Sequence, residues 1–219
     1  MIVVAVFWAV PNIVTLSYFS SQFSNMGISI YYSGSLKTKG SLPKLIEEVK
    51  DIAETYKWEY HIFGEEFPRG SFGKDTFDDK AYGICFTPPG SEPLTFTFAS
   101  NGELISPWIL EYYFKKEQES KISYGNLTKT HYAGAIAHKV IIHLFDYISK
   151  KYFRKFKLQD EAQYWETRDE KVLMQNFNYL NACMDSFSLA LETLPINKGE
   201  KIDKYLERVF KQVQKKRKK

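Results

Sequence analysis

Residues 158–170 read Leu-Gln-Asp-Glu-Ala-Gln-Tyr-Trp-Glu-Thr-Arg-Asp-Glu and lie between two strongly amphipathic segments. This stretch contains five carboxylates, one arginine, one tyrosine and one tryptophan, a density of reactive side chains that no other part of the chain reaches. The segments around it predict the fold, and its own side chains are the first candidates for a functional site.

Two long helices flank this stretch. Before it, apolar residues recur at helical spacing from about Thr130 to Tyr152. Their stripe consists of Ile136, Val140, Ile141, Leu144, Phe145 and Ile148. After it, Thr167 and Glu170 have the spacing of a capping box, which predicts the start of the longest helix, ended by Pro195. A last helix follows from the apolar face of residues 202–213.

The N-terminal half has the pattern of an antiparallel sheet with one helix. Alternating apolar and aromatic residues predict strands at 28–32, 58–62, 82–86, 94–98 and, later in the chain, 153–158. Asn101-Gly102 is the strongest hairpin dipeptide and leads into residues 103–105. Ser41 is expected to cap a helix that extends to about Tyr56. Residues 108–114 are apolar without periodicity and receive no assignment.

Together these elements predict an α+β fold. We expect an N-terminal antiparallel sheet of four to six strands with one helix, followed by three amphipathic helices packed on the sheet. Residues 26–210 would form this single domain, between an apolar extension at 1–25 and a basic tail at 211–219.

The N-terminal extension has two main interpretations. Residues 1–36 carry no charged side chain, and residues 2–19 form an apolar run at the lower limit for a membrane span. Translation that starts at Met26 would make residues 1–25 an upstream extension of the reading frame. A membrane anchor would contact the bilayer through residues 2–19 and keep the lysine-bearing body in the cytoplasm. A cleaved signal peptide ranks third, because no lysine or arginine precedes the run.

The charge distribution bears on partners and compartment. The tail at 211–219 holds six of the thirty basic residues, and without it 24 basic residues face 26 acidic ones. The folded body is therefore slightly acidic, and nothing in it predicts specific nucleic-acid binding. Two cysteines, Cys85 and Cys183, are too few for a disulfide framework, which favours a reducing, cytoplasmic location.

The acidic stretch suggests two kinds of chemistry. Carboxylates are the ligands that Mg²⁺ and Mn²⁺ prefer, and an arginine can clamp a carboxylate or phosphate. The catalytic candidates are Asp160, Glu161, Glu166 and Arg168, and the ligand-binding candidates are Tyr164, Trp165, His131 and His138. A structural interpretation competes with this one, because acidic residues at a helix N-terminus are favoured by the helix dipole.

The histidines do not predict an isolated metal site. His131 and His138 share a helix face but stand about 10 Å apart along it, too far to bind one ion. We assign no metal and expect core-edge histidines, although either side chain could join groups from another element.

No complete catalytic motif accompanies these residues. The run from Gly70 to Asp75 resembles a phosphate loop but lacks its spacing. The sequence therefore favours a non-catalytic intracellular binding or accessory protein that uses the acidic-aromatic surface at 158–170, for an unidentified protein or small ligand and without a cofactor. The alternative is a hydrolase of a phosphate ester that uses the carboxylates at 160–169 and Mg²⁺ or Mn²⁺.

Overall fold

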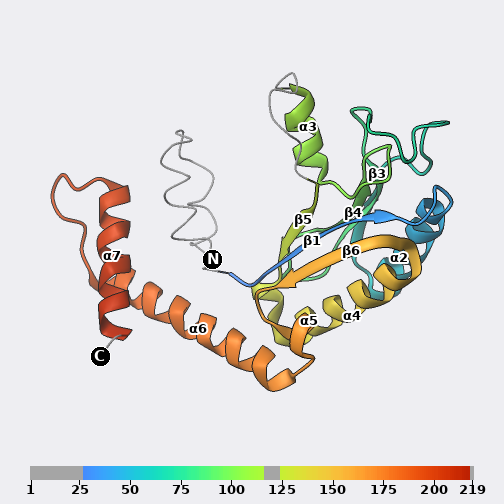
Figure 1. The fold of residues 1–219 in the computed structure, drawn as a ribbon. Coiled ribbons are helices and arrows are strands. Elements are labelled where there is room, and N and C mark those ends of the chain that lie inside the picture. The colour runs from blue at the N-terminus through green and yellow to red at the C-terminus, as the bar shows by residue number, and fades with distance from the viewer. Residues whose placement is uncertain (1–26, 116–123, 218–219) are drawn as a thin grey trace. The chain divides into compact units, whose positions relative to one another are not determined.

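The computed structural model describes residues 27–115 and 124–217, and the predictions for residues 1–25 lie outside them. The chain divides into two compact units, Ile28–Tyr179 and a second unit that contains Leu180–Lys219. The larger unit has the predicted α+β class and contains all candidate site residues (Figure 1).

One antiparallel sheet is built around the first strand. Its strand order is β5 (Asn126–Lys129), β1 (Ser29–Leu36) and β6 (Phe153–Asp160). Strands β1 and β6 were predicted and are longer than expected, whereas β5 was not predicted. At only four residues, β5 alternates buried and exposed positions too briefly to be recognised in the sequence.

The second antiparallel sheet is the predicted meander. It contains β2 (Glu59–Ile62), β3 (Tyr82–Thr87) and β4 (Leu94–Phe98). The expected half-burial of β2 is wrong, because this strand lies at the sheet edge and has no buried residue. The Asn101-Gly102 turn is present, and residues 103–105 then make isolated bridges to both sheets, such as Ser35 with Glu103.

The prediction of one N-terminal sheet of four to six strands is therefore wrong. The described residues form two three-stranded sheets, and residues 103–105 are too short to merge them into one ladder. Strands β5 and β6 also come after helix α3 (Pro107–Lys115), so strands and helices alternate in the chain order.

An aromatic core joins the sheets to helix α4 (Gly134–Tyr152), which lies along the β1–β6 sheet (Figure 1). The ring of Tyr32 lies 4.5 Å from that of Phe145 and 6.4 Å from that of Phe96. The Tyr32 hydroxyl donates to the Thr95 carbonyl and so ties β1 to the second sheet. Large buried rings with satisfied polar tips contribute strongly to a core of this size.

Helix α4 buries only part of the predicted stripe. Ile141, Phe145 and Ile148 lie in the core, whereas Ile136 is 82% exposed and Val140 is 44% exposed. The predicted stripe was therefore wrong at its N-terminal end. There the fully buried residue is His138, which contacts Thr130 and Asp160.

The other helices also correct details of the prediction. Helix α2 (Ser41–Tyr56) has Gly40 at its N-cap, so Ser41 is already helical and bonds instead to the Thr38 hydroxyl at 3.1 Å. The unassigned residues 108–114 belong to α3 (Pro107–Lys115). Only Leu110 of this helix is fully buried, which explains the missing periodicity.

The C-terminal helices are α5 (Tyr164–Thr167), α6 (Glu170–Thr193) and α7 (Ile202–Arg217). Asp169 caps α6 by accepting the Lys171 amide at 2.7 Å, so the predicted capping box at Thr167 is wrong. Phe177 of α6 packs on His138 of α4 at 5.5 Å.

In the smaller unit, α7 folds against the end of α6. The Tyr205 hydroxyl donates to the carbonyls of Leu191 and Leu194. Within the described residues, no helix is both long and apolar enough to cross a membrane.

Candidate functional site

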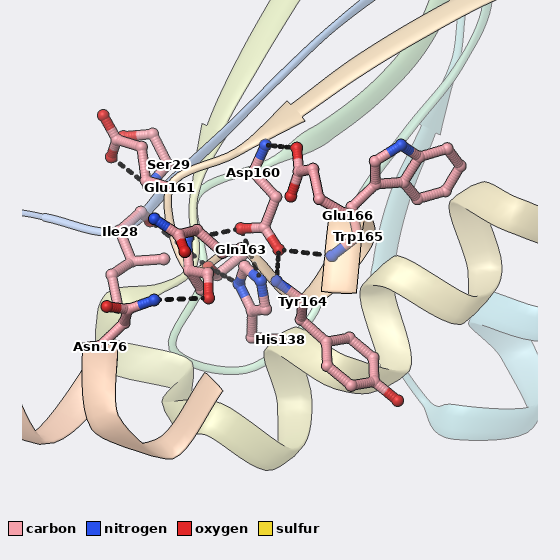
Figure 2. A network of polar contacts seen from close by, with 12 residues as sticks. Ile28, Ser29, His138, Asp160, Glu161, Gln163, Tyr164, Trp165, Glu166 and Asn176 are labelled. Carbon is pink, nitrogen blue, oxygen red and sulfur yellow. Dashed lines mark hydrogen bonds and ion pairs between the residues drawn. The ribbon is translucent and has the colours of Figure 1, made fainter. Parts of the chain in front are cut away.

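The carboxylate of Asp160 is the centre of the acidic stretch, and it is buried. Asp160 ends β6 and is 3% exposed. Its Oδ1 accepts the amide of Ala162 at 2.8 Å, and its Oδ2 accepts those of Tyr164 at 2.8 Å and Trp165 at 3.0 Å. Figure 2 shows the carboxylate pointing toward the amides of Tyr164 and Trp165 and toward His138.

His138 is the fourth partner of this carboxylate. Its Nε2 lies 3.0 Å from Asp160 Oδ1 but off the line of an ideal hydrogen bond, so the contact is chiefly electrostatic. Burial opposes the charge on Asp160, yet the contacts from His138, Trp165 and Ala162 outweigh it and hold the pKa of this carboxyl below its usual value.

Thr130 extends the chain of polar groups on the other side of the imidazole. Its hydroxyl lies 2.6 Å from His138 Nδ1, and its amide donates to the Ile28 carbonyl at 2.9 Å. Hydroxyl, imidazole and carboxylate follow one another as in a hydrolase triad. However, Thr130 and His138 have no exposed surface, so a substrate has no access to the hydroxyl. The triad-like arrangement is a structural link between β1, α4 and the α5 turn.

Glu161 and Glu166 do not join Asp160 in a metal centre. The Glu161 carboxylate accepts the amide of Ser29 at 2.8 Å, and Glu166 accepts the amide of Asp160 at 3.2 Å. The Asp160 carboxylate already accepts three backbone amides and contacts His138, which leaves few lone pairs for a metal ion. Among the described residues, no group of three or more histidine, cysteine or acidic side chains could hold a metal ion.

The two aromatic candidates have different positions. Tyr164 is 4% exposed, and its hydroxyl lies 3.3 Å from His143 Nε2, so it anchors the turn in the core. Trp165 is half-buried at the edge of the sheet, with its ring 6.1 Å from that of Phe156. Only Trp165 can contact a partner.

Arg168 covers the tryptophan. Its guanidinium lies 4.7 Å from the Trp165 ring centroid and 3.0 Å from Asp146 Oδ1. The stacking and the ion pair together fix the orientation of the arginine side chain, because its planar guanidinium makes both contacts at once. Arg168 and Trp165 therefore form one composite surface feature.

His131 does not reach the carboxylates. It is 9% exposed and lies against Tyr132 and Phe177, and burial lowers its pKa. Its Nδ1 has no hydrogen-bond partner within the described part of the chain. This placement corresponds to a core histidine rather than a ligand.

The backbone of the α5 turn is held in an unusual conformation. Gln163 and Arg168, at the two ends of α5, have left-handed φ values of 60° and 55°. Each such non-glycine residue costs about 1–3 kcal/mol, so surrounding contacts must enforce it. These contacts include the Asp160 carboxylate and Asn176, whose side chain donates to the Ala162 carbonyl at 2.8 Å.

Several participants in this network were not predicted from sequence, namely Ser29, Thr130, Asp146 and Asn176. None of the four belongs to a motif. Their only signal is spatial, because each joins the network through hydrogen bonds or an ion pair with residues of other elements.

Comparison with models of protein families, with curated proteins and with solved structures finds no match for this chain. The site geometry is therefore the only basis for a functional argument.

Proposed function

We propose that this chain is a non-catalytic intracellular binding or accessory protein, and that its partner docks on the exposed part of residues 158–170. The observation that supports this is the pre-organised α5 turn. A buried carboxylate accepts three amides of the turn, while left-handed residues bracket the turn. A turn that is already rigid loses little conformational entropy when a partner binds to it, which favours binding.

The chemistry of the exposed side chains favours a basic protein segment as the partner. Glu166, Asp169 and Glu170 are exposed, and Arg168 is the one cation of the stretch. A segment rich in lysine or arginine would gain electrostatic attraction here. The half-buried ring of Trp165 would supply the apolar contact that a purely electrostatic encounter lacks.

The buried state of the polar triad supports the non-catalytic part of the proposal. A nucleophile and its base must reach the substrate, and these groups are covered. No observation favours the phosphate-ester hydrolase, because its central carboxylate is saturated by protein donors. The intracellular part is supported by the cysteine content, because two cysteines are too few for a disulfide framework.

Binding to an array of short peptides of graded charge tests this function. We expect basic peptides to bind and acidic ones not to bind. The double variant Glu166→Gln/Glu170→Gln should weaken the best peptide at least tenfold, because both substitutions remove charge and keep shape. Glu47→Gln is the matched control, since Glu47 is also an exposed glutamate, on helix α2.

A second variant separates specific docking from general charge attraction. Trp165→Leu leaves every charge in place and should still weaken binding severalfold. Equal binding by the wild type and both variants, or no preference for basic peptides, would refute the proposed surface.

A further inference from the structure

A cavity of about 420 Å³ opens at the Asn101-Gly102 turn. Its walls come from the end of β1, the loop at residues 72–75, the turn itself, Tyr124 and Arg154. This volume is at the lower end of the range for small-molecule sites, about 300–1,000 Å³. Its lining shares no residue with the acidic stretch.

The loop over this cavity is tied to the turn by short-range contacts. The Gly73 amide donates to the Asn101 carbonyl at 3.0 Å, and the Ser71 hydroxyl donates to the Ser100 carbonyl at 2.7 Å. Gly102 has a φ of +88°, and a Cβ there would lie 2.4 Å from the Phe72 ring. Glycine therefore allows this ring to lie on the turn and form an apolar wall.

Four charged side chains of both signs line the cavity. Lys74 and Arg154 are cations, and Asp75 and Glu103 are anions. None of the four makes an ion pair with another described residue. The net charge of the lining is therefore zero, which disfavours a strongly anionic or strongly cationic ligand. The lining nevertheless offers a partner for a positive group and a partner for a negative group of one ligand.

Neutral polar groups complete the lining. Ser35 is 3% exposed, and its hydroxyl has no hydrogen-bond partner within the described residues. The Tyr124 hydroxyl has a long contact of 3.4 Å with the Asn101 amide. Burial raises the pKa of Tyr124, so its phenol stays protonated and can donate.

We propose that this cavity binds a small zwitterion of the amino-acid class, whose carboxylate pairs with the cations Lys74 and Arg154 and whose ammonium pairs with the anions Asp75 and Glu103. The Tyr124 hydroxyl supplies a neutral hydrogen bond. The inference is independent of the protein-binding surface at 158–170, so either can fail without the other.

Ligand-detected NMR with each standard L-amino acid at millimolar concentration provides the first test, on the full chain. At least one amino acid should show saturation transfer. For that amino acid, the N-acetyl derivative removes the ammonium and the carboxamide derivative removes the carboxylate. Each derivative should bind at least tenfold more weakly by calorimetry.

Charge variants then locate the site. Arg154→Gln and Glu103→Gln should each weaken the amino acid at least tenfold, whereas Arg154→Lys should retain most of the affinity. Lys171→Gln, an exposed lysine on α6, is the control and should bind like the wild type.

Three results would overturn the inference: no amino acid binds, the singly charged derivatives bind as well as the zwitterion, or the folded Arg154→Gln and Glu103→Gln variants bind normally. If circular dichroism shows that a variant does not fold, the comparison of the derivatives on the wild type still tests whether binding needs both charges of the ligand.

Discussion

Replacing Asp160 with alanine removes the one acceptor shared by three amides of the α5 turn. The amides of Ala162 and Tyr164 make buried hydrogen bonds to this carboxylate, and that of Trp165 makes a partly buried one. An orphaned buried donor costs about 1–3 kcal/mol. Because water can reach the half-buried Trp165 end, we expect a total loss of about 3–5 kcal/mol, as for other broken buried pairs. This is a large part of a typical stability of about 5–15 kcal/mol.

Urea unfolding followed by circular dichroism at pH 7 measures this loss. With a slope of about 2–3 kcal/mol per molar urea, the midpoint should fall by roughly 1–2 M. Glu166→Gln is the control: it keeps an acceptor for the Asp160 amide and should change stability by less than about 0.5 kcal/mol. A loss below about 1 kcal/mol for Asp160→Ala would show that the carboxylate does not hold the turn, and the argument for a pre-organised surface would fail with it.

Four further outcomes follow from particular residues. The pKa of Asp160 lies below its ordinary value of 3.8, so the stability that its charged carboxylate contributes is complete above pH 3.8 and is lost as the pH falls further. Acid unfolding of Asp160→Asn should lack this loss of stability. Burial lowers the pKa of His131 from 6.5, so protonation opposes folding below that pH, and His131→Phe should reduce the stability loss between pH 6.5 and pH 5 in urea melts. Gly83→Ala should cost clearly more than Gly134→Ala, because the positive φ at each position costs an alanine about 1–3 kcal/mol, but only at Gly83 would the Cβ also lie 2.0 Å from a carbonyl oxygen, that of Phe96; similar thermal melts for the two would contradict this. Adding Mn²⁺ or Mg²⁺ should leave the melting temperature unchanged, and a rise that Asp160→Ala abolishes would restore the hydrolase interpretation.

Much of the secondary structure could be predicted from the sequence. The helices at Ser41–Tyr56 and Glu170–Thr193 and the strands of the meander have long or clean periodicity, and local spacing alone determines that pattern. Elements that are short or that bury few residues were missed, because they show too little of a periodic pattern. Strand β5 has four residues, and α3 buries only Leu110, so neither repeats a pattern often enough to be read.

The candidate site could be located from the sequence, but the roles of its residues could not be assigned. A density of acidic and aromatic side chains marked residues 158–170, and the structure shows there a bracketed turn with Trp165 and Arg168 on its surface. Nothing in the spacing indicated that Asp160 is buried while Glu166 is exposed. That difference depends on His138 and Thr130, which meet the stretch only after α4 packs beneath β6.

By itself, the sequence determined the α+β class, the positions of the longer helices and the acidic-aromatic character of residues 158–170, because hydrophobic periodicity and side-chain chemistry are local properties. Only the tertiary structure decided which carboxylate is saturated, which face of α4 is buried, and that Arg154 and Glu103 line one cavity. Hydrogen-bond satisfaction and burial depend on residues far apart in the chain, such as Thr130 and Asp160, and their partners are set only when strands β1, β5 and β6 pair.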